Sequence, residues 1–288
     1  MRTLRAVDEV REHVAAARAA GRSVGLVPTM GAFHDGHVAL MHAALERCDE
    51  VVVSLFVNPA QFGEAADLDA YPRTEAADAA VAEALGVGAL FVPSVAEMYP
   101  DGFATTVTVG ALGEVLEGAQ RGPGHFAGVC TVVCKLFAIV APDVAFFGQK
   151  DAQQVLVVRR MARDLNLPVE IAAVPTVREA DGLAMSSRNG RLGPADRERA
   201  TALRAGLEAA RAALYAGERD PRAVEAAGVA AMAGAGVTPE YFALVDPDTL
   251  EPVHAGAQRV LVVVAARVGP ARLIDNLPLD LEPVATRR

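Results

Sequence analysis

The stretch VGLVPTMGAFHDGH, residues 24–37, places a short apolar strand directly before a turn-rich loop and the start of a helix. We expect the strand at Val24–Val27, the loop at Pro28–Gly36 and the helix from about His37 to Arg47. This order brings backbone N–H groups and the positive end of a helix to the carboxyl end of a strand. The sequence therefore predicts an anion-binding loop here.

Strand and helix patterns alternate on both sides of this stretch. Val51–Val57 reads VVVSLFV and is apolar on both faces, as buried parallel strands are. Further strands are expected at Ala89–Val92, Val144–Phe147 and Val169–Val174, and further helices before Leu85 and at Phe126–Val140 and Ala152–Leu165. Leu4, Val7, Val10 and Val14 recur at helical spacing and predict a first helix that Gly21 closes. The alternation predicts an α/β fold with a doubly wound parallel, Rossmann-like sheet.

The alternation of predicted strands and helices ends near Pro175. Residues 176–192 have the character of a loop. The helices expected after it are Pro194–Ala216 and Pro221–Ala233, and the strands are Glu240–Val245, Arg259–Ala266 and Arg272–Asp275. Helices followed by strands indicate a smaller α+β domain. We therefore predict a Rossmann-like domain over residues 1–175 and a second domain over residues 176–288.

Composition narrows the class of protein. The 288 residues are 52% hydrophobic and 22% charged, which argues against intrinsic disorder. A net charge of −9 disfavours nucleic acid and anionic membranes as partners. No apolar run is long enough to span a membrane, and the charged N-terminus is unlike a signal peptide. Three cysteines, two of them (Cys130 and Cys134) in an apolar helix, indicate a reduced, cytoplasmic protein.

Two more loops follow predicted strands. Asn58–Gly63 leaves a buried strand, and the amide of Gln61 offers both a donor and an acceptor, which suits a hydroxy acid. Phe147–Asp151 leads into a helix that begins near Gln153 and Gln154. Lys150 supplies a point charge for phosphate. Asp151 is expected to accept from ribose hydroxyls or to favour the helix N-terminus, and these two roles are compatible.

A fourth loop carries Met185, Ser186, Ser187, Arg188 and Asn189. Two hydroxyls and a guanidinium in a flexible loop form a movable phosphate clamp. Taken singly, each of the four loops is also compatible with an ordinary polar turn.

Other anion and metal motifs fit less well. Gly31 and Gly36 have P-loop spacing, but His37 and Val38 stand where the motif needs Lys and Ser or Thr. The dinucleotide motif G-x-G-x-x-G is absent from this loop. His34 and His37 could hold zinc, but no cysteine lies near them in sequence. We predict no protein-bound metal site.

The loops together resemble the pantothenate synthetase (pantoate–β-alanine ligase) family. The matching stretches are PTMGAFHDGH (28–37), SLFVNPAQFG (54–63), DLDAYPRT (67–74), HFAGV (125–129), FGQKDAQQ (147–154) and VPTVREADGLAMSSRNGRL (174–192). The His34–His37 string also resembles the wider HIGH-type nucleotidyltransferases, and Met185–Arg188 stands where their KMSKS loop would stand. The resemblance implies that ATP and (R)-pantoate form pantoyl adenylate and pyrophosphate, and that β-alanine then gives pantothenate and AMP.

The resemblance also implies residue roles. His37, His34 and Lys150 would be catalytic, with His37 the better proton donor. The residues expected to bind ATP are Met30, Gly31, Ala32, Phe33, His34, Asp35, Gly36, His37, Gly148, Gln149, Lys150, Asp151, Val177, Met185, Ser186, Ser187 and Arg188. Gln61 and Gln154 would bind pantoate, Gln61 would also lie near β-alanine, and Asn58 would support this pocket. The first domain would bind nucleotide and pantoate, and the second would be a lid.

The resemblance further implies Mg²⁺ with ATP and a homodimer. A cluster of cations and N–H donors is needed because the first step brings a carboxylate to a polyanion. Two other hypotheses remain open at this point. One is a different nucleotidyltransferase on the same fold, such as a cytidylyltransferase, and the other is a nucleotide-binding module without turnover.

Overall fold

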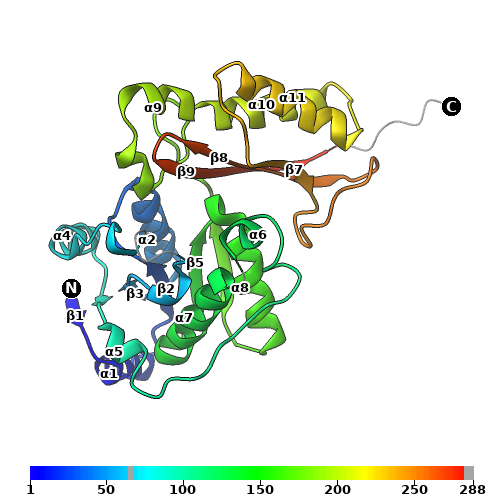
Figure 1. The fold of residues 1–288 in the computed structure, drawn as a ribbon. Coiled ribbons are helices and arrows are strands. Elements are labelled where there is room, and N and C mark those ends of the chain that lie inside the picture. The colour runs from blue at the N-terminus through cyan, green and yellow to red at the C-terminus, as the bar shows by residue number, and fades with distance from the viewer. Residues whose placement is uncertain (64–67, 123, 282–288) are drawn as a thin grey trace. The chain divides into compact units, whose positions relative to one another are not determined.

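A computed structural model describes residues 1–63, 68–122 and 124–281 (Figure 1). Asp67, which opens the stretch DLDAYPRT, lies outside the described residues, as does the end of the chain after residue 281. The chain divides into two compact units, Met1–Pro175 and Thr176–Arg288, called here the first and second unit.

The first unit contains a six-stranded sheet in which every pair of neighbours is parallel. Its elements in chain order are β1 (Arg2–Leu4), α1 (Val7–Ala19), β2 (Val24–Thr29), α2 (Asp35–Arg47), β3 (Glu50–Leu55), η1 (Pro59–Gln61), α4 (Glu75–Leu85), β4 (Ala89–Phe91), α5 (Val95–Met98), α6 (Glu117–Arg121), α7 (Gly124–Val140), β5 (Val144–Gly148), η2 (Gln149–Asp151), α8 (Ala152–Asp164) and β6 (Glu170–Val174). The strand order β1-β4-β3-β2-β5-β6 confirms the predicted doubly wound α/β sheet. The chain winds away from β2 in opposite directions through β3 and β5. The carboxyl ends of these strands therefore form the crevice where open α/β sheets bind ligands.

Helices cover both faces of this sheet because its strands are apolar on both sides. On one face Val27 packs in a cluster with Met41 of α2 and Ala82 of α4. On the other face its neighbour Leu26 joins a cluster with Val133 of α7, and α1 and α8 complete this layer. Alternate residues of β2 thus face opposite layers, and the strand is fixed in register at the centre of the unit.

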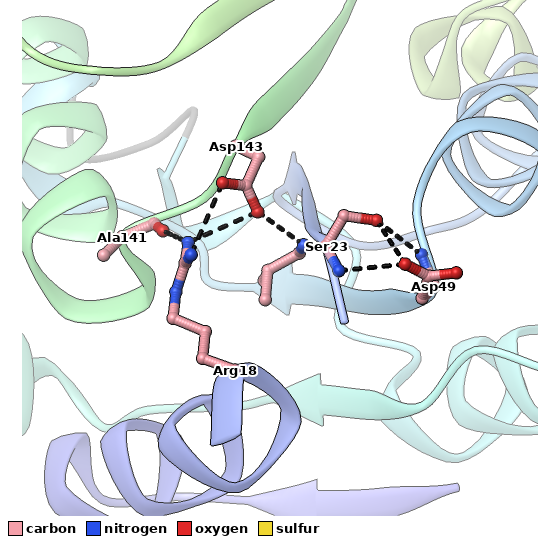
Figure 2. Close-up of polar contacts among 6 residues, drawn as sticks. Arg18, Ser23, Asp49, Ala141 and Asp143 are labelled. Carbon is pink, nitrogen blue, oxygen red and sulfur yellow. Dashed lines mark hydrogen bonds and ion pairs between the residues drawn. The ribbon is translucent and has the colours of Figure 1, made fainter. Parts of the chain in front are cut away.

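Polar contacts hold together the amino ends of the central strands (Figure 2). Asp143 accepts a hydrogen bond from the backbone N–H of Val24 at 2.7 Å and pairs with Arg18. Asp49 accepts from both the backbone N–H and the hydroxyl of Ser23. These contacts lie just before β2, β3 and β5, so they stabilise the edge opposite the predicted ligand loops.

One element at the N-terminus was predicted wrongly. Leu4 belongs to β1, which pairs with β4, and the first helix begins only at Val7. Leu4 matches the helical spacing because it is buried in the same apolar cluster as Val10 and Val14. A three-residue edge strand is too short for an alternating pattern to distinguish it from a helix turn.

The second unit confirms the predicted smaller α+β arrangement. Its elements are η3 (Ser187–Arg191), α9 (Pro194–Ala200), α10 (Ala202–Tyr215), α11 (Pro221–Ala233), β7 (Tyr241–Val245), β8 (Arg259–Val268) and β9 (Ala271–Asp280). The three strands form an antiparallel sheet in the order β7-β8-β9, and α10 and α11 pack against it. The prediction of a single helix over Pro194–Ala216 was wrong, because the helix is interrupted at Thr201, between α9 and α10. No helix in the described part of the chain is long and apolar enough to cross a membrane.

Candidate active site

Three of the predicted loops meet at the carboxyl edge of the central strands. They follow β2, β3 and β5, which are neighbours in the sheet. The side-chain amide nitrogen of Gln61 lies 2.9 Å from the sulfur of Met30, which joins the loop after β3 to the loop after β2. The structure thus brings together residues that the sequence places in separate stretches.

The loop after β2 is shaped by a buried carboxylate on α4. Gly31 and Ala32 both have positive φ angles, +89° and +55°. Asp78, 2% exposed, accepts from the backbone N–H groups of Ala32 at 3.0 Å and Phe33 at 2.8 Å, and from the hydroxyl of Thr74. Asp78 therefore fixes the turn that leads into α2. Sequence reasoning missed this residue.

His34 and His37 lie together at the first turn of α2. The Nδ1 atom of His34 accepts from the backbone N–H of Gly36 at 3.1 Å, and Nδ1 of His37 accepts from the N–H of His34 at 3.3 Å. An accepting Nδ1 places the proton of each neutral ring on Nε2. Each ring thus uses Nδ1 as an acceptor and directs Nε2–H away from the backbone at a helix N-terminus, the arrangement that binds anions.

Burial, together with the nearby charges of His34 and Lys150, lowers the pKa of His37 to about 3. His37 is therefore neutral at pH 7 in the ligand-free protein. It can donate a hydrogen bond through Nε2–H, but acting as a full proton donor requires a bound anion to raise its pKa. The influence of Lys150 on His37 shows that the loops after β2 and β5 face the same region.

Lys150 lies in η2, directly after β5. Its ammonium is 3.9 Å from the carboxylate of Asp151, and its side chain is 19% exposed. Asp151 is half-exposed and occupies the N-cap position of α8, where its carboxylate lies at the positive helix end without making a side-chain capping hydrogen bond. A largely enclosed ammonium that is near enough to His37 to lower its pKa forms a local positive site in an acidic protein.

A hydrogen-bond network fixes the loop after β3. Asn58 is 1% exposed, and its Nδ2 donates to Oε1 of Gln61 and to the carbonyl of Gly128, both at 3.1 Å. Its Oδ1 accepts from the hydroxyl of Tyr99 at 2.7 Å and from the N–H of Ala60 at 3.3 Å. Asn58 therefore supports Gln61 directly.

Two glutamines at the start of α8 differ in their surroundings. Gln153 is buried, and its amide bonds to the backbone of Leu112, Val115 and Glu117. Gln154 is half-buried beside it. Because Gln153 is used for folding, Gln154 is the better candidate for a ligand. The ring of His125 contacts the carbonyl of Gln61 at 2.9 Å, so this histidine supports the same loop.

The remaining predicted residues lie in the second unit. The N–H of Met185 donates to the carbonyl of Val177 at 3.0 Å, so these two residues are neighbours across a tight bridge. The hydroxyl of Ser186 accepts from the N–H of Arg188 and begins η3. The backbone of Val177 and the Ser186–Arg188 segment are thus held in one small structure.

The segment that contains Val177 and Ser186–Arg188 is anchored by ion pairs. Sequence reasoning missed these pairs. Arg178 binds both carboxylate oxygens of buried Asp275 on β9, at 2.7 and 3.0 Å. Glu179 accepts from Arg197 at 2.5 Å and from Asn189 at 2.6 Å, and the bond from Arg197, with a smaller effect of Asn189, lowers the pKa of Glu179. The adjacent loop is thereby tied to β9 and to α9. A pair of opposite charges so far apart in sequence gave no local signal.

Among the described residues, no group of three or more His, Cys, Asp or Glu side chains could hold a metal ion. Mg²⁺ in phosphate-transfer sites is commonly held by one or two carboxylates, water and substrate phosphates. Such an ion fits the site only if the nucleotide itself supplies most of its ligands.

The open parallel sheet, with a His-Asp-Gly-His motif opening the helix after its central strand, defines a HIGH-type nucleotidyltransferase fold. A model of the pantoate–β-alanine ligase family matches residues 2–278, and the chain belongs to this family. The family catalyses the ATP-dependent ligation of pantoate and β-alanine, so the chain is an enzyme of the ligase class.

Individual relatives agree with this assignment. The chain is 52% identical over 284 residues to the pantothenate synthetase of Rhizorhabdus wittichii, covering 98% of this chain and 100% of that protein. It is 54% identical over 268 residues to that of Thioalkalivibrio sulfidiphilus, covering 92% and 93%. The crystal structure of pantothenate synthetase from Thermus thermophilus superposes with a TM-score of 0.91 at 47% identity, covering 96% and 99%.

A more distant solved structure carries ligands. The Francisella tularensis pantoate–β-alanine ligase was crystallised with β-γ ATP and β-alanine. It matches with a TM-score of 0.78 at 30% identity, covering 96% of this chain and 97% of that one.

Proposed function

We propose that this chain joins (R)-pantoate to β-alanine through an enzyme-bound pantoyl adenylate. In the first step a pantoate carboxylate oxygen attacks the α-phosphorus of ATP, and the bond to the bridging oxygen of the β-phosphate breaks to release pyrophosphate. In the second step the β-alanine amine attacks the acyl carbon, the bond to AMP breaks, and the amine loses a proton to solvent. The observation that carries the proposal is the presence of two Nε2–H imidazoles at the N-terminus of α2, with Lys150 of η2 near enough to His37 to lower its pKa.

The first unit would hold the reacting phosphates and pantoate. His34, His37 and the backbone from Met30 to Gly36 would donate to the phosphates, and Lys150 would stabilise the charge that develops on the leaving pyrophosphate. Gly148 and Gln149 would lie along the nucleotide, and Asp151 would accept from ribose hydroxyls. The positive end of α2 adds to this field.

The loop after β3 would bind the other substrates. Gln61 and Gln154 would hold pantoate, whose carboxylate and hydroxyls need both donors and acceptors. Gln61 would also contact β-alanine. Asn58 keeps the Gln61 amide in one orientation through the 3.1 Å bond between them.

The second unit would contribute the backbone of Val177 to adenine and Met185–Arg188 to the triphosphate. The carbonyl of Val177 already accepts from Met185, so its backbone N–H is the better group for an adenine nitrogen. Arg188 can bind phosphate in a bidentate manner. Closing this loop would exclude water, which would otherwise hydrolyse the acyl adenylate.

We further propose that the ion accompanying ATP is Mg²⁺, that the enzyme is a homodimer and that it acts in the cytoplasm. Mg²⁺ would neutralise phosphate charge when ATP is bound. Reduced, buried Cys48 and Cys130 are compatible with a reducing compartment.

A pyrophosphate-release assay with ATP, Mg²⁺ and (R)-pantoate, with and without β-alanine, tests the proposal. We expect sustained turnover with AMP as co-product when β-alanine is present, and a single burst without it. Pyrophosphate release with a nucleotide left on the product would indicate a different nucleotidyltransferase. ATP binding without pyrophosphate release would indicate a binding module.

A further inference from the structure

Tyr99 is joined to the candidate pantoate pocket although it comes from a different part of the first unit. It follows α5, and its hydroxyl bonds to Oδ1 of Asn58 at 2.7 Å. Its ring packs against Phe56 and Phe103 and lies below the ammonium of Lys135. The ring is thus held from several sides, which fixes the direction of the hydroxyl.

The orientation of the Asn58 amide is determined by its backbone partners. The N–H of Ala60 must meet an oxygen, and the carbonyl of Gly128 must meet an N–H. Oδ1 therefore faces Ala60 and Nδ2 faces Gly128. Since Tyr99 points at Oδ1, its hydroxyl is the donor of that bond.

The order of donors continues to Gln61. Because Nδ2 of Asn58 donates to Oε1 of Gln61, the Nε2 group of Gln61 turns the other way, to the side where Met30 lies. A glutamine amide can flip and exchange its donor and acceptor ends. The bond from Asn58 selects one of these two states, with the donor end directed to the loop after β2.

We propose that Tyr99 is a positioning residue for pantoate, acting through Asn58 to hold the donor end of Gln61 in the substrate pocket. The inference rests on the proposed function, in which Gln61 binds pantoate. Two further observations support it. Burial raises the pKa of Tyr99 to about 12, so the hydroxyl keeps its proton. A Cβ at Gly128 would overlap the carbonyl of Ala60, so α7 approaches η1 closely enough to take part in the network.

The substitution Tyr99→Phe tests the relay because it removes the hydroxyl and keeps the ring. We expect the KM for pantoate to rise about 5-fold, the scale of one net hydrogen bond. The KM for ATP and kcat should each change by less than about 2-fold, because the phosphate-binding groups are untouched. Tyr215→Phe is the matched control, since Tyr215 is 63% exposed at the end of α10.

A double-mutant cycle shows whether the effect passes through Asn58. If it does, Tyr99→Phe will leave the pantoate KM unchanged when added to Asn58→Ala, or when added to Gln61→Ala if the Asn58 variant fails to fold. Independent, multiplying effects on the pantoate KM would overturn the relay, and so would equal changes in the KM values of both substrates. If Gln61→Ala itself leaves the pantoate KM unchanged, the pocket assignment in the proposed function fails and the relay falls with it. If Gln61→Ala raises that KM and Tyr99→Phe does not, only the relay fails.

Discussion

The imidazole rings of His34 and His37 lie with their centroids 4.2 Å apart and their planes tilted by 44°. Two protonated rings at this separation would repel each other, and the protein gives each Nδ1 a backbone donor in place of a proton. His37, with a pKa near 3, is therefore neutral until a polyanion binds.

Acid should destabilise the protein through His37. The pKa of His37 is about 3 in the folded state and near 6.5 when unfolded, so below pH 6.5 only the unfolded chain takes up the proton. Stability from this group is complete above pH 6.5 and is lost as the pH falls toward 3, by about 2 kcal/mol at pH 5. Urea unfolding of the wild type and of His37→Gln at pH 5 and 7 measures the difference.

His42→Gln is the control, because His42 is exposed on the same helix. We expect this variant to lose as much stability between pH 7 and pH 5 as the wild type. A His37→Gln protein with the wild-type pH dependence would refute the assigned pKa.

Charge stabilisation by Lys150 should be large. We expect Lys150→Ala and His37→Ala each to slow adenylate formation by at least about 100-fold, the scale of one lost preorganised donor. Single-turnover pyrophosphate release measures this step directly. Arg163→Ala removes a 72% exposed cation from the far end of α8 and should leave the rate unchanged. Near-normal release by the Lys150 variant would exclude its proposed role.

Asp78 should control ATP binding without touching ATP. Asp78→Asn leaves one oxygen for the N–H groups of Ala32 and Phe33 and turns an amide NH₂ toward a donor. We expect about 1–3 kcal/mol lower stability and a KM for ATP raised about 10-fold, because the loop loses its shape. The pantoate KM should change less. Asp101→Asn, at an exposed position, is the control, and equal KM values in both variants would contradict the prediction.

Removing only one partner of the Arg178–Asp275 ion pair should lower the stability of the protein strongly. Arg178→Met leaves the buried carboxylate of Asp275 without its partner and should destabilise the second unit by about 3–5 kcal/mol. Adding Asp275→Leu should recover most of the loss, because the uncompensated charge is gone. Thermal unfolding of the single and double variants measures both effects.

The exposed pair of Arg259 and Asp248 provides the comparison. Arg259→Met should cost less than about 1 kcal/mol, because water already solvates both charges. If the two Arg→Met variants were equally stable, the buried pair would contribute no more than a surface pair.

Much of the fold was accessible from local patterns. The strand predicted at Val51–Val57 and the helix predicted at Phe126–Val140 are each apolar along most of their length, so the type of each element was predicted correctly. Their ends differ from those in the structure by no more than two residues. The prediction failed for short elements and for an interrupted helix. β1 has three residues, and Thr201 carries no helix-breaking signal although the chain breaks there.

Consecutive residues alone specify the α/β class and the family resemblance and predict the four candidate ligand loops, because buried strands, strand-to-helix loops and family motifs each lie in one continuous stretch. Packing in three dimensions was needed to reveal that Asp78 holds the loop after β2, that Tyr99 orders Asn58 and Gln61, and that Asp275 pairs with Arg178. These are contacts between residues 41 or more positions apart, and each depends on which strands are neighbours and which faces are buried. A hydrogen bond or a pKa shift follows from that packing, and the residue types alone do not specify it.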